Sequence, residues 1–522
     1  MFLTRLRFHL LFTAVLIIAN SLYSFAQPQY LSLSKDLISK YEKRMNTSDS
    51  SIHSAIKPYN LGELSGIVDT TVNQGKTTSI SMHAEPLFSL QSAYDLANSR
   101  AFSGYSVGGL VRGNLGKKVF FQFAGIGGNS DFAGYVDSFI VKSHVVPGLG
   151  YAYASKLGYS YQNYSGYISY SPNKVFNFQL GQDKNFWGDG YRSLILSDVA
   201  NNYPFLKIST KIWKIKYMNL FAAFKDVTNP TGLKSDFKNK YGSFHYLSWN
   251  ICKRLNIGLF ETIIWQGTDT TRTRGYDVNY FNPIIFFRPV EYSLGSSDNA
   301  LVGASFKVRA FKKQQFYGQL MLDEFLLKEM KADVQHWLHP DNSAIVWGWW
   351  ANKYGFQLGF KSFDIFKIEN LHFQTEFNYV RPYTYSHGSA QQNYGHYNQP
   401  LAHPFGANFR EQVSLLKYSY KKWPLEGKII VANYGTDSAG LSFGKNIFQS
   451  YANRAREHNN YMGQGIATNL LFGAVKFVYH FKPLQVEAGI INRWERSSFK
   501  KDSTFSIYLG IRTDLYNFYN DF

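Results

Sequence analysis

The chain has 522 residues, 45% of them hydrophobic and 18% aromatic, and a formal net charge of +19 at pH 7. Its mean hydropathy is −0.26, and beyond the N-terminal segment no stretch is long and apolar enough for a transmembrane helix, which excludes a helical membrane protein. Cys252 is the single cysteine, which excludes an internal disulfide and a metal site built on paired cysteines.

The N-terminal residues have the pattern of an export signal. Arg5 and Arg7 precede an apolar run over 10–18, and small residues ending at Ala26 suit cleavage by a signal peptidase. The alternative is a membrane-anchoring helix, but the run is shorter than the ~20 apolar residues that cross a bilayer. We therefore predict a cleaved signal peptide over 1–26.

The segment 27–76 is predicted to be a periplasmic lead-in or a small plug. Within it, Leu33, Leu37 and Tyr41 recur at helical spacing, which predicts one short helix over 31–45.

From residue 77 to residue 522 the hydrophobic period changes to two. Over 175–182, Phe176, Phe178 and Leu180 share one face of a strand, and the alternate positions hold Asn, Gln and Gly. A polar face rich in amides suits a wet lumen better than the dry core of a sandwich. A tandem of soluble β-sandwiches is the structural alternative, but it would not need so many aromatic residues.

Comparable alternation recurs along the rest of the chain, at 107–115, 118–127, 164–171, 215–226, 255–265, 299–309, 314–323, 354–363, 371–379, 410–420, 427–434, 484–492 and 505–512. The fold class is therefore predicted to be all-β: a transmembrane antiparallel β-barrel of about 16–18 strands, with a short N-terminal helical lead-in or plug. The alternation stops near Asp514, so 514–522 is expected to be a tail beyond the strand before it.

Long connections rich in Tyr, Asn, Gly and His separate some strands, and we expect them outside the cell or in the lumen. They cover 184–203, 266–298, 324–352, 382–408 and 445–464. One of them contains Trp347, Trp349 and Trp350, which we interpret as part of an interfacial aromatic girdle, with a sugar-stacking surface as the alternative.

The positive charge favours two kinds of partner. Basic rims or loops can contact the anionic headgroups of outer-membrane lipid, or they can attract an acidic ligand such as an anionic polysaccharide. Nucleic acid is not expected as a partner, because the sequence contains no motif of a nucleic-acid-binding protein.

Serine and histidine motifs suggest chemistry only weakly. The segments 440–444 and 104–108 fit the G-x-S-x-G pattern, but a nucleophile elbow needs a strand, a turn and a helix, and both flanks read as strand or loop. His336 and His339 with nearby Asp341 could hold a metal on a helix, but Pro340 argues against one. We predict no metal and no cofactor.

Three loop histidines and one acidic pair complete the candidates. His387, His396 and His403 share a loop without regular ligand spacing and are interpreted as polar loop residues. Asp323 and Glu324 could act as paired carboxylates, but we interpret them as part of a rigidifying network in the lumen with Arg288, Arg309 or Arg381 as partners. No catalytic residue is predicted.

A resemblance to a known family covers most of the chain. The stretch 181–204, GQDKNFWGDGYRSLILSDVANNYP, resembles the signature of the capsule-assembly Wzi family and, more closely, of the RemB-type gliding-motility outer-membrane proteins within it. Further matching stretches, in order, are 281–292, 295–299, 317–319, 323–325, 381–387 and 401–408.

The resemblance implies a barrel of about 18 strands that holds capsular polysaccharide and catalyses nothing. For the RemB type it also implies a role in gliding over surfaces. The chain departs from the Wzi pattern at its N-terminus, where only 31–45 reads as helical in place of a substantial helical plug.

The predicted function is therefore a non-enzymatic outer-membrane barrel that binds or positions surface polysaccharide, supporting gliding motility or adhesion. Sugar rings would stack on Trp and Tyr, and Arg would donate charge-assisted hydrogen bonds. The predicted polysaccharide-binding residues are Arg192, Arg288, Arg381, Tyr383 and His387. The alternatives are a structural partner in an outer-membrane secretion or motility assembly, an outer-membrane lipase or protease, and a diffusion porin.

Overall fold

The computed structural model describes residues 29–48, 52–64, 66–68, 80–228, 233–268, 273–284, 298–421, 423–438, 440–481, 484–513 and 517–522. The predicted signal peptide and Arg288 lie outside the described residues. No helix in the described ranges has the length and apolarity needed to span a bilayer.

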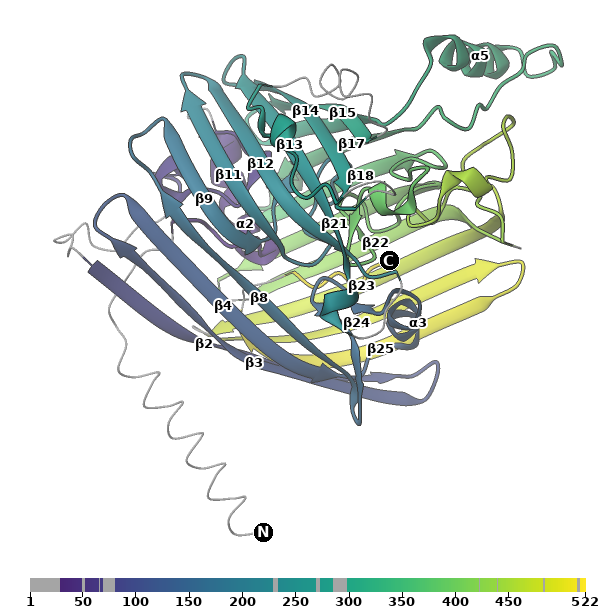
Figure 1. Cartoon of the computed structure of the whole chain (residues 1–522). Coiled ribbons are helices and arrows are strands. Elements are labelled where there is room, and N and C mark those ends of the chain that lie inside the picture. The colour runs from purple at the N-terminus through teal and green to yellow at the C-terminus, as the bar shows by residue number, and fades with distance from the viewer. Residues whose placement is uncertain are drawn as a thin grey trace.

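Eighteen long antiparallel strands of the described chain form one closed barrel, and each pairs with its neighbours in chain order. They are β2 (Ile80–Asp95), β3 (Arg100–Leu115), β4 (Val119–Ser130), β8 (Gly158–Tyr170), β9 (Phe176–Asp183), β11 (Tyr203–Ile212), β12 (Ile215–Asp226), β13 (Lys238–Asn250), β14 (Leu255–Gln266), β15 (Asn299–Ala310), β16 (Gln314–Leu322), β17 (Tyr354–Phe363), β18 (Leu371–Val380), β21 (Phe409–Tyr420), β22 (Trp423–Thr436), β23 (Ile466–Phe481), β24 (Leu484–Ser497) and β25 (Lys501–Thr513). The pairing of β25 with β2, from Ser89↔Arg512 to Asp95↔Ser506, closes the ring. The predicted fold class and strand number are confirmed (Figure 1).

The two faces of the wall follow the alternation in the sequence. On β9, Phe178 and Leu180 are 37% and 65% exposed on the outside, whereas Asn177 and Gln179 are 9% and 2% exposed on the inside. A closed barrel leaves no unpaired strand edge in lipid, and an apolar exterior around a polar interior is what an outer membrane requires. The chain is therefore an outer-membrane barrel of the Gram-negative type.

The connections between strands alternate between two ends of the barrel. Those at one end, the short-turn end, are brief, as at 116–118, 213–214 and 311–313; those at the other, the loop end, include 131–157, 184–202, 323–353 and 381–408. Outer-membrane barrels place short turns in the periplasm and long loops outside the cell, which orients this one. The sequence patterns missed the long connection 131–157, which contains α3 (Gly134–Ser143).

The N-terminal segment folds inside the barrel at the short-turn end as a plug of α2 (Lys35–Thr47), β1 (Ile56–Lys57) and η1 (Leu61–Leu64) (Figure 1). The predicted helix is present but begins four residues later than residue 31, because the Ser34 hydroxyl accepts the Leu37 amide at 3.3 Å and caps it. Ile38 and Met45 on the helix are buried against Tyr59 and Leu64. The plug thus has a small core of its own.

Ion pairs hold the plug to the wall. Asp36 lies 2.8 Å from Lys476, and Lys417 and Arg512 are each 3.7 Å away. Burial alone would raise the pKa of Asp36, but these three cations outweigh it and hold the pKa well below its ordinary value. Asp36 is therefore ionised at neutral pH and links the plug to three different strands.

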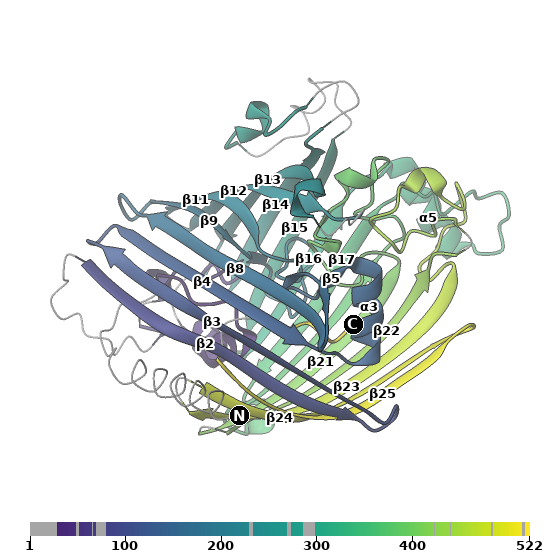
Figure 2. The same ribbon diagram turned by 60° about the horizontal axis from the view of Figure 1, so that its bottom comes forward.

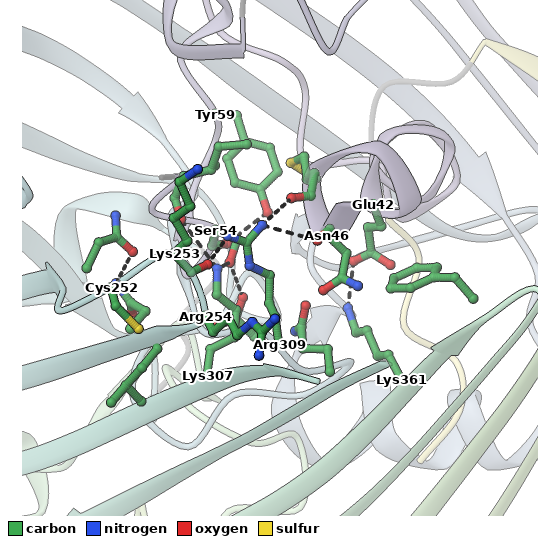
Figure 3. A pocket seen from close by; sticks show the side chains of 18 of the residues that line it. Glu42, Asn46, Ser54, Tyr59, Cys252, Lys253, Arg254, Lys307, Arg309 and Lys361 are labelled. Carbon is green, nitrogen blue, oxygen red and sulfur yellow. Dashed lines mark hydrogen bonds and ion pairs between the residues drawn. The ribbon is translucent and has the colours of Figure 1, made fainter. Parts of the chain in front are cut away.

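The end of α2 is seated on the wall as well. The Arg309 guanidinium donates to the carbonyl oxygens of Asn46 at 3.1 Å and Ser48 at 2.7 Å, and Glu42 pairs with Lys361 at 2.6 Å (Figure 3). A cation at the carbonyl end of a helix satisfies free acceptors and complements the helix dipole.

Residues 517–522 lie in the lumen outside any strand, as the predicted tail requires. The Tyr519 hydroxyl donates to Asp198 at 2.6 Å, and Asp521 pairs with Lys428 at 2.7 Å. The Phe522 ring lies 4.9 Å from Phe139 of α3, and Figure 2 shows the C-terminus beside that helix. The lumen is therefore filled from both ends of the described chain.

Candidate functional site

The connection 184–202 descends from the loop end into the lumen and forms the centre of the main hydrophobic core. Trp187, Leu194, Ile195 and Leu196 within it are all 0% exposed. This is the stretch that carries the family resemblance, and its apolar run lies among the strands. This long loop accordingly folds inward.

Arg192 lies within this loop and is 1% exposed. Its guanidinium pairs with Glu411 at 3.2 Å and with Asp521 at 3.1 Å. Glu376 on β18 accepts the backbone amides of Tyr191 at 2.8 Å and Arg192 at 3.1 Å. The network fixes the loop and the tail to the wall, because charges removed from water need such partners.

The acidic pair predicted for the lumen has a different partner from those expected. Asp323 pairs with Lys353 at 3.1 Å and accepts the Tyr385 amide at 2.8 Å, rather than meeting an arginine among the described residues. Arg309 instead holds the plug, and Arg381 pairs with Asp333 at 2.6 Å. The prediction was wrong for Arg309 and Arg381, because pairing across loops depends on how they pack, and Arg288 lies outside the described residues.

The described residues Arg381, Tyr383 and His387 gather at the loop end under one group of aromatic rings, whereas Arg192 lies deeper. Arg381 is 5% exposed, and its guanidinium also donates to the Trp349 carbonyl at 3.5 Å. The Tyr383 hydroxyl donates to the Ser442 carbonyl at 2.8 Å. All three side chains are engaged by neighbouring loops in this structure.

The His387 ring meets Tyr451 edge to face, with the ring centroids 5.8 Å apart. Burial lowers the pKa of His387 to about 4, with the nearby Lys353 charge acting in the same direction. The ring is therefore neutral at pH 7, and its Nδ1 accepts the Ser389 amide at 3.2 Å.

Above these residues lies what we name the aromatic loop cluster: Trp349, Trp350, Tyr451 and Arg454. The Trp350 ring lies 4.5 Å from Tyr451, 6.2 Å from Trp349 and 6.1 Å from Tyr383 beneath it. The Arg454 guanidinium lies 4.6 Å from the Trp350 ring and its side chain is 26% exposed. Half-buried rings beside a reachable guanidinium form a surface suited to sugars.

The cluster corrects one interpretation and adds residues that the motifs missed. Trp350 packs on Tyr451 and Arg454 of another loop, an arrangement expected of the stacking-surface alternative rather than of the girdle. Tyr451 and Arg454 were not singled out, although the density of Tyr, Arg and His over 445–464 was visible in the sequence. Their closeness to Trp350 depends on two loops that are far apart in the chain.

A further helix, α5 (Leu327–Leu338), projects from the same end of the barrel (Figure 1). Asp333 on one side of it anchors Arg381 and accepts the Gly348 amide at 2.7 Å. Leu327, Val334 and Leu338 share a different face of the helix and are 75%, 56% and 57% exposed.

The candidate metal ligands and the candidate nucleophiles lie where a structural role accounts for them. The His336 ring stacks on Trp347 with centroids 4.1 Å apart, and the described residues contain no group of three potential metal ligands. Ser442 lies buried in a loop, and Ser106 lies within β3. Neither serine follows the strand, turn and helix order of a nucleophile elbow.

No protein-family model matches the chain. No curated protein matches it. Among solved structures, the chain is similar to Wzi, an outer membrane protein involved in group 1 capsule assembly in Escherichia coli and described as a carbohydrate-binding β-barrel. The TM-score is 0.58 at 11% identity, over 93% of this chain and 99% of that one.

Two barrels of Pseudomonas aeruginosa are less similar. OprD has a TM-score of 0.43 at 9% identity, covering 85% of this chain and 97% of its own. OpdK has a TM-score of 0.44 at 10% identity, covering 82% of this chain and 98% of its own. The chain thus has a Wzi-like fold.

Proposed function

We propose that this protein is a non-enzymatic outer-membrane barrel that binds or positions a surface polysaccharide through the aromatic loop cluster. The observation that carries the proposal is the arrangement of Trp350, Tyr451 and Arg454 at the loop end. Aromatic faces stack on the C–H faces of sugar rings, and a guanidinium donates paired hydrogen bonds to a uronate or phosphate. On the resemblance of its signature stretches, we assign the role to RemB-type gliding motility or surface adhesion.

In this proposal the buried residues predicted to bind polysaccharide position the aromatic loop cluster instead. Arg381, Tyr383 and His387 hold the cluster from beneath, and Arg192 holds the loop that lies under them. Arg288 lies outside the described residues and stays a predicted contact. A fold similar to that of a protein described as carbohydrate-binding supports the proposal.

The test is binding of the detergent-folded protein to the host's own surface polysaccharide across a salt series. We expect saturable binding that weakens with salt and falls about five- to tenfold in Trp350→Ala and in Arg454→Gln. Trp249→Ala is the matched control, because Trp249 is 40% exposed on β13 near the short-turn end. No binding at low salt by folded protein, or equal loss in the control, contradicts the proposal.

A second candidate is a structural partner in an outer-membrane secretion or motility assembly. The exposed apolar face of α5, formed by Leu327, Val334 and Leu338, favours it, because apolar patches exposed on one side of a helix are common at protein contacts. Mild detergent extraction would then yield a stoichiometric partner with the wild type, and Leu338→Asp would lose it. Extraction of the barrel alone, with intact polysaccharide binding, contradicts this candidate.

A further inference from the structure

A cavity lies far from the loop end. It has a volume of about 560 Å³ and separates the plug segment 56–63 from the barrel wall at the short-turn end. The wall there consists of the turn 171–175 and the neighbouring parts of β9, β11 and β12. The volume falls within the range of small-molecule sites.

The lining of this cavity carries excess positive charge. Five lysines line it, against the single carboxylate of Glu63: Lys57, Lys174, Lys207, Lys211 and Lys216. Glu63 is already engaged, since Lys216 lies 3.0 Å and Lys211 3.7 Å from its oxygens.

The other three lysines form no ion pair with a carboxylate in the described part of the chain. Lys207 is 3% exposed, and its Nζ donates to the amide oxygen of Asn185 at 2.9 Å. Lys57 donates to the Gly188 carbonyl. Burial lowers the pKa of Lys57 to about 8, so it is mostly protonated at neutral pH.

Two tryptophans also line this cavity. Trp187 lies in its wall at 0% exposure, stacked on Tyr246 with the ring centroids 5.4 Å apart. Trp213 stands at the rim with its ring 75% exposed.

We infer that this cavity binds the carboxylate or phosphate group of an anionic saccharide at the periplasmic end. The ammonium groups would bind the anionic oxygens, and the Trp213 ring would cover a sugar face. Across the plug, Lys253, Arg254 and Lys361 line a neighbouring pocket, so the positive potential extends over this end of the lumen (Figure 3). The inference is independent of the proposed function, because the two sites lie at opposite ends.

The experiment titrates trigalacturonate into full-length, detergent-folded protein by calorimetry, with neutral maltotriose as the matched sugar. Saturable binding of trigalacturonate that weakens with salt, with none of maltotriose, is expected. Inorganic phosphate should compete, since it offers the same oxygens. The double variant Lys174→Gln/Lys211→Gln should weaken binding about tenfold, since each lost charge pair contributes up to ~1 kcal/mol.

The control variant is Lys118→Gln, which removes an exposed lysine at the same end outside the cavity. It should change the affinity less than about twofold. Equal weakening in this control, equal binding of maltotriose, or no binding of trigalacturonate by folded protein overturns the inference. Trp350→Ala should leave this binding unchanged; loss there would move the site to the loop end, overturning this inference while leaving the proposed function intact.

Discussion

Replacing Arg192 with methionine should release the connection 184–202 from the lumen. The substitution keeps most of the side-chain volume but leaves Glu411 and Asp521, which are 1% and 2% exposed, without the cation 3.2 and 3.1 Å away. Removing one partner of a buried ion pair costs about 3–5 kcal/mol. Because the barrel strands are held by their own hydrogen bonds, we expect this substitution to destabilise the loop and the tail more than the barrel.

Native-state hydrogen exchange measures this loss directly. In the wild type, the backbone amides of Tyr191 and Arg192 donate to Glu376. In Arg192→Met, the amides at these two positions should exchange more than about a hundredfold faster. Arg100→Met is the control, because Arg100 pairs with Asp131 while 41% exposed and should contribute under about 1 kcal/mol. Unchanged exchange across 184–202 in the Arg192 variant would refute the assignment of this network as the anchor of the loop.

Three further predictions test the wall, the plug and the loops. Leu180→Arg, at a position 65% exposed on the outer face of β9, should lower the free energy of unfolding in vesicles by about 2–4 kcal/mol, and an effect near zero would argue against lipid contact there. Asp36→Asn leaves Lys476, Lys417 and Arg512 repelling one another, so planar-bilayer conductance should rise; unchanged conductance would mean that other contacts hold the plug. His387, whose pKa burial lowers to about 4, is neutral when folded and binds a proton on opening below its ordinary pKa of about 6.5. Loop stability should therefore be highest above pH 6.5 and decline toward pH 4, as read from exchange over 381–388 corrected for intrinsic rates, and His387→Phe should flatten that decline.

The candidate site could be predicted only in part. Aromatic and basic loop composition pointed to sugar binding, and Arg381, Tyr383 and His387 do lie together. What composition did not show is that they lie beneath Trp350 and Tyr451, because those rings come from two other loops. The cavity beside Trp187 was not predicted either, since its lysines belong to the plug, the turn 171–175 and the strands β11 and β12.

The sequence by itself determined the barrel and the outward face of the strands that show alternation. A strand places successive side chains on opposite faces, so the period of two along Phe176, Phe178 and Leu180 assigns faces without knowledge of any distant residue. Only the tertiary structure decided which charges meet. Arg192 and Asp521 are 329 positions apart, and they pair because the strand register and the folding of loop and tail into one lumen bring them within hydrogen-bond distance, which no local pattern encodes.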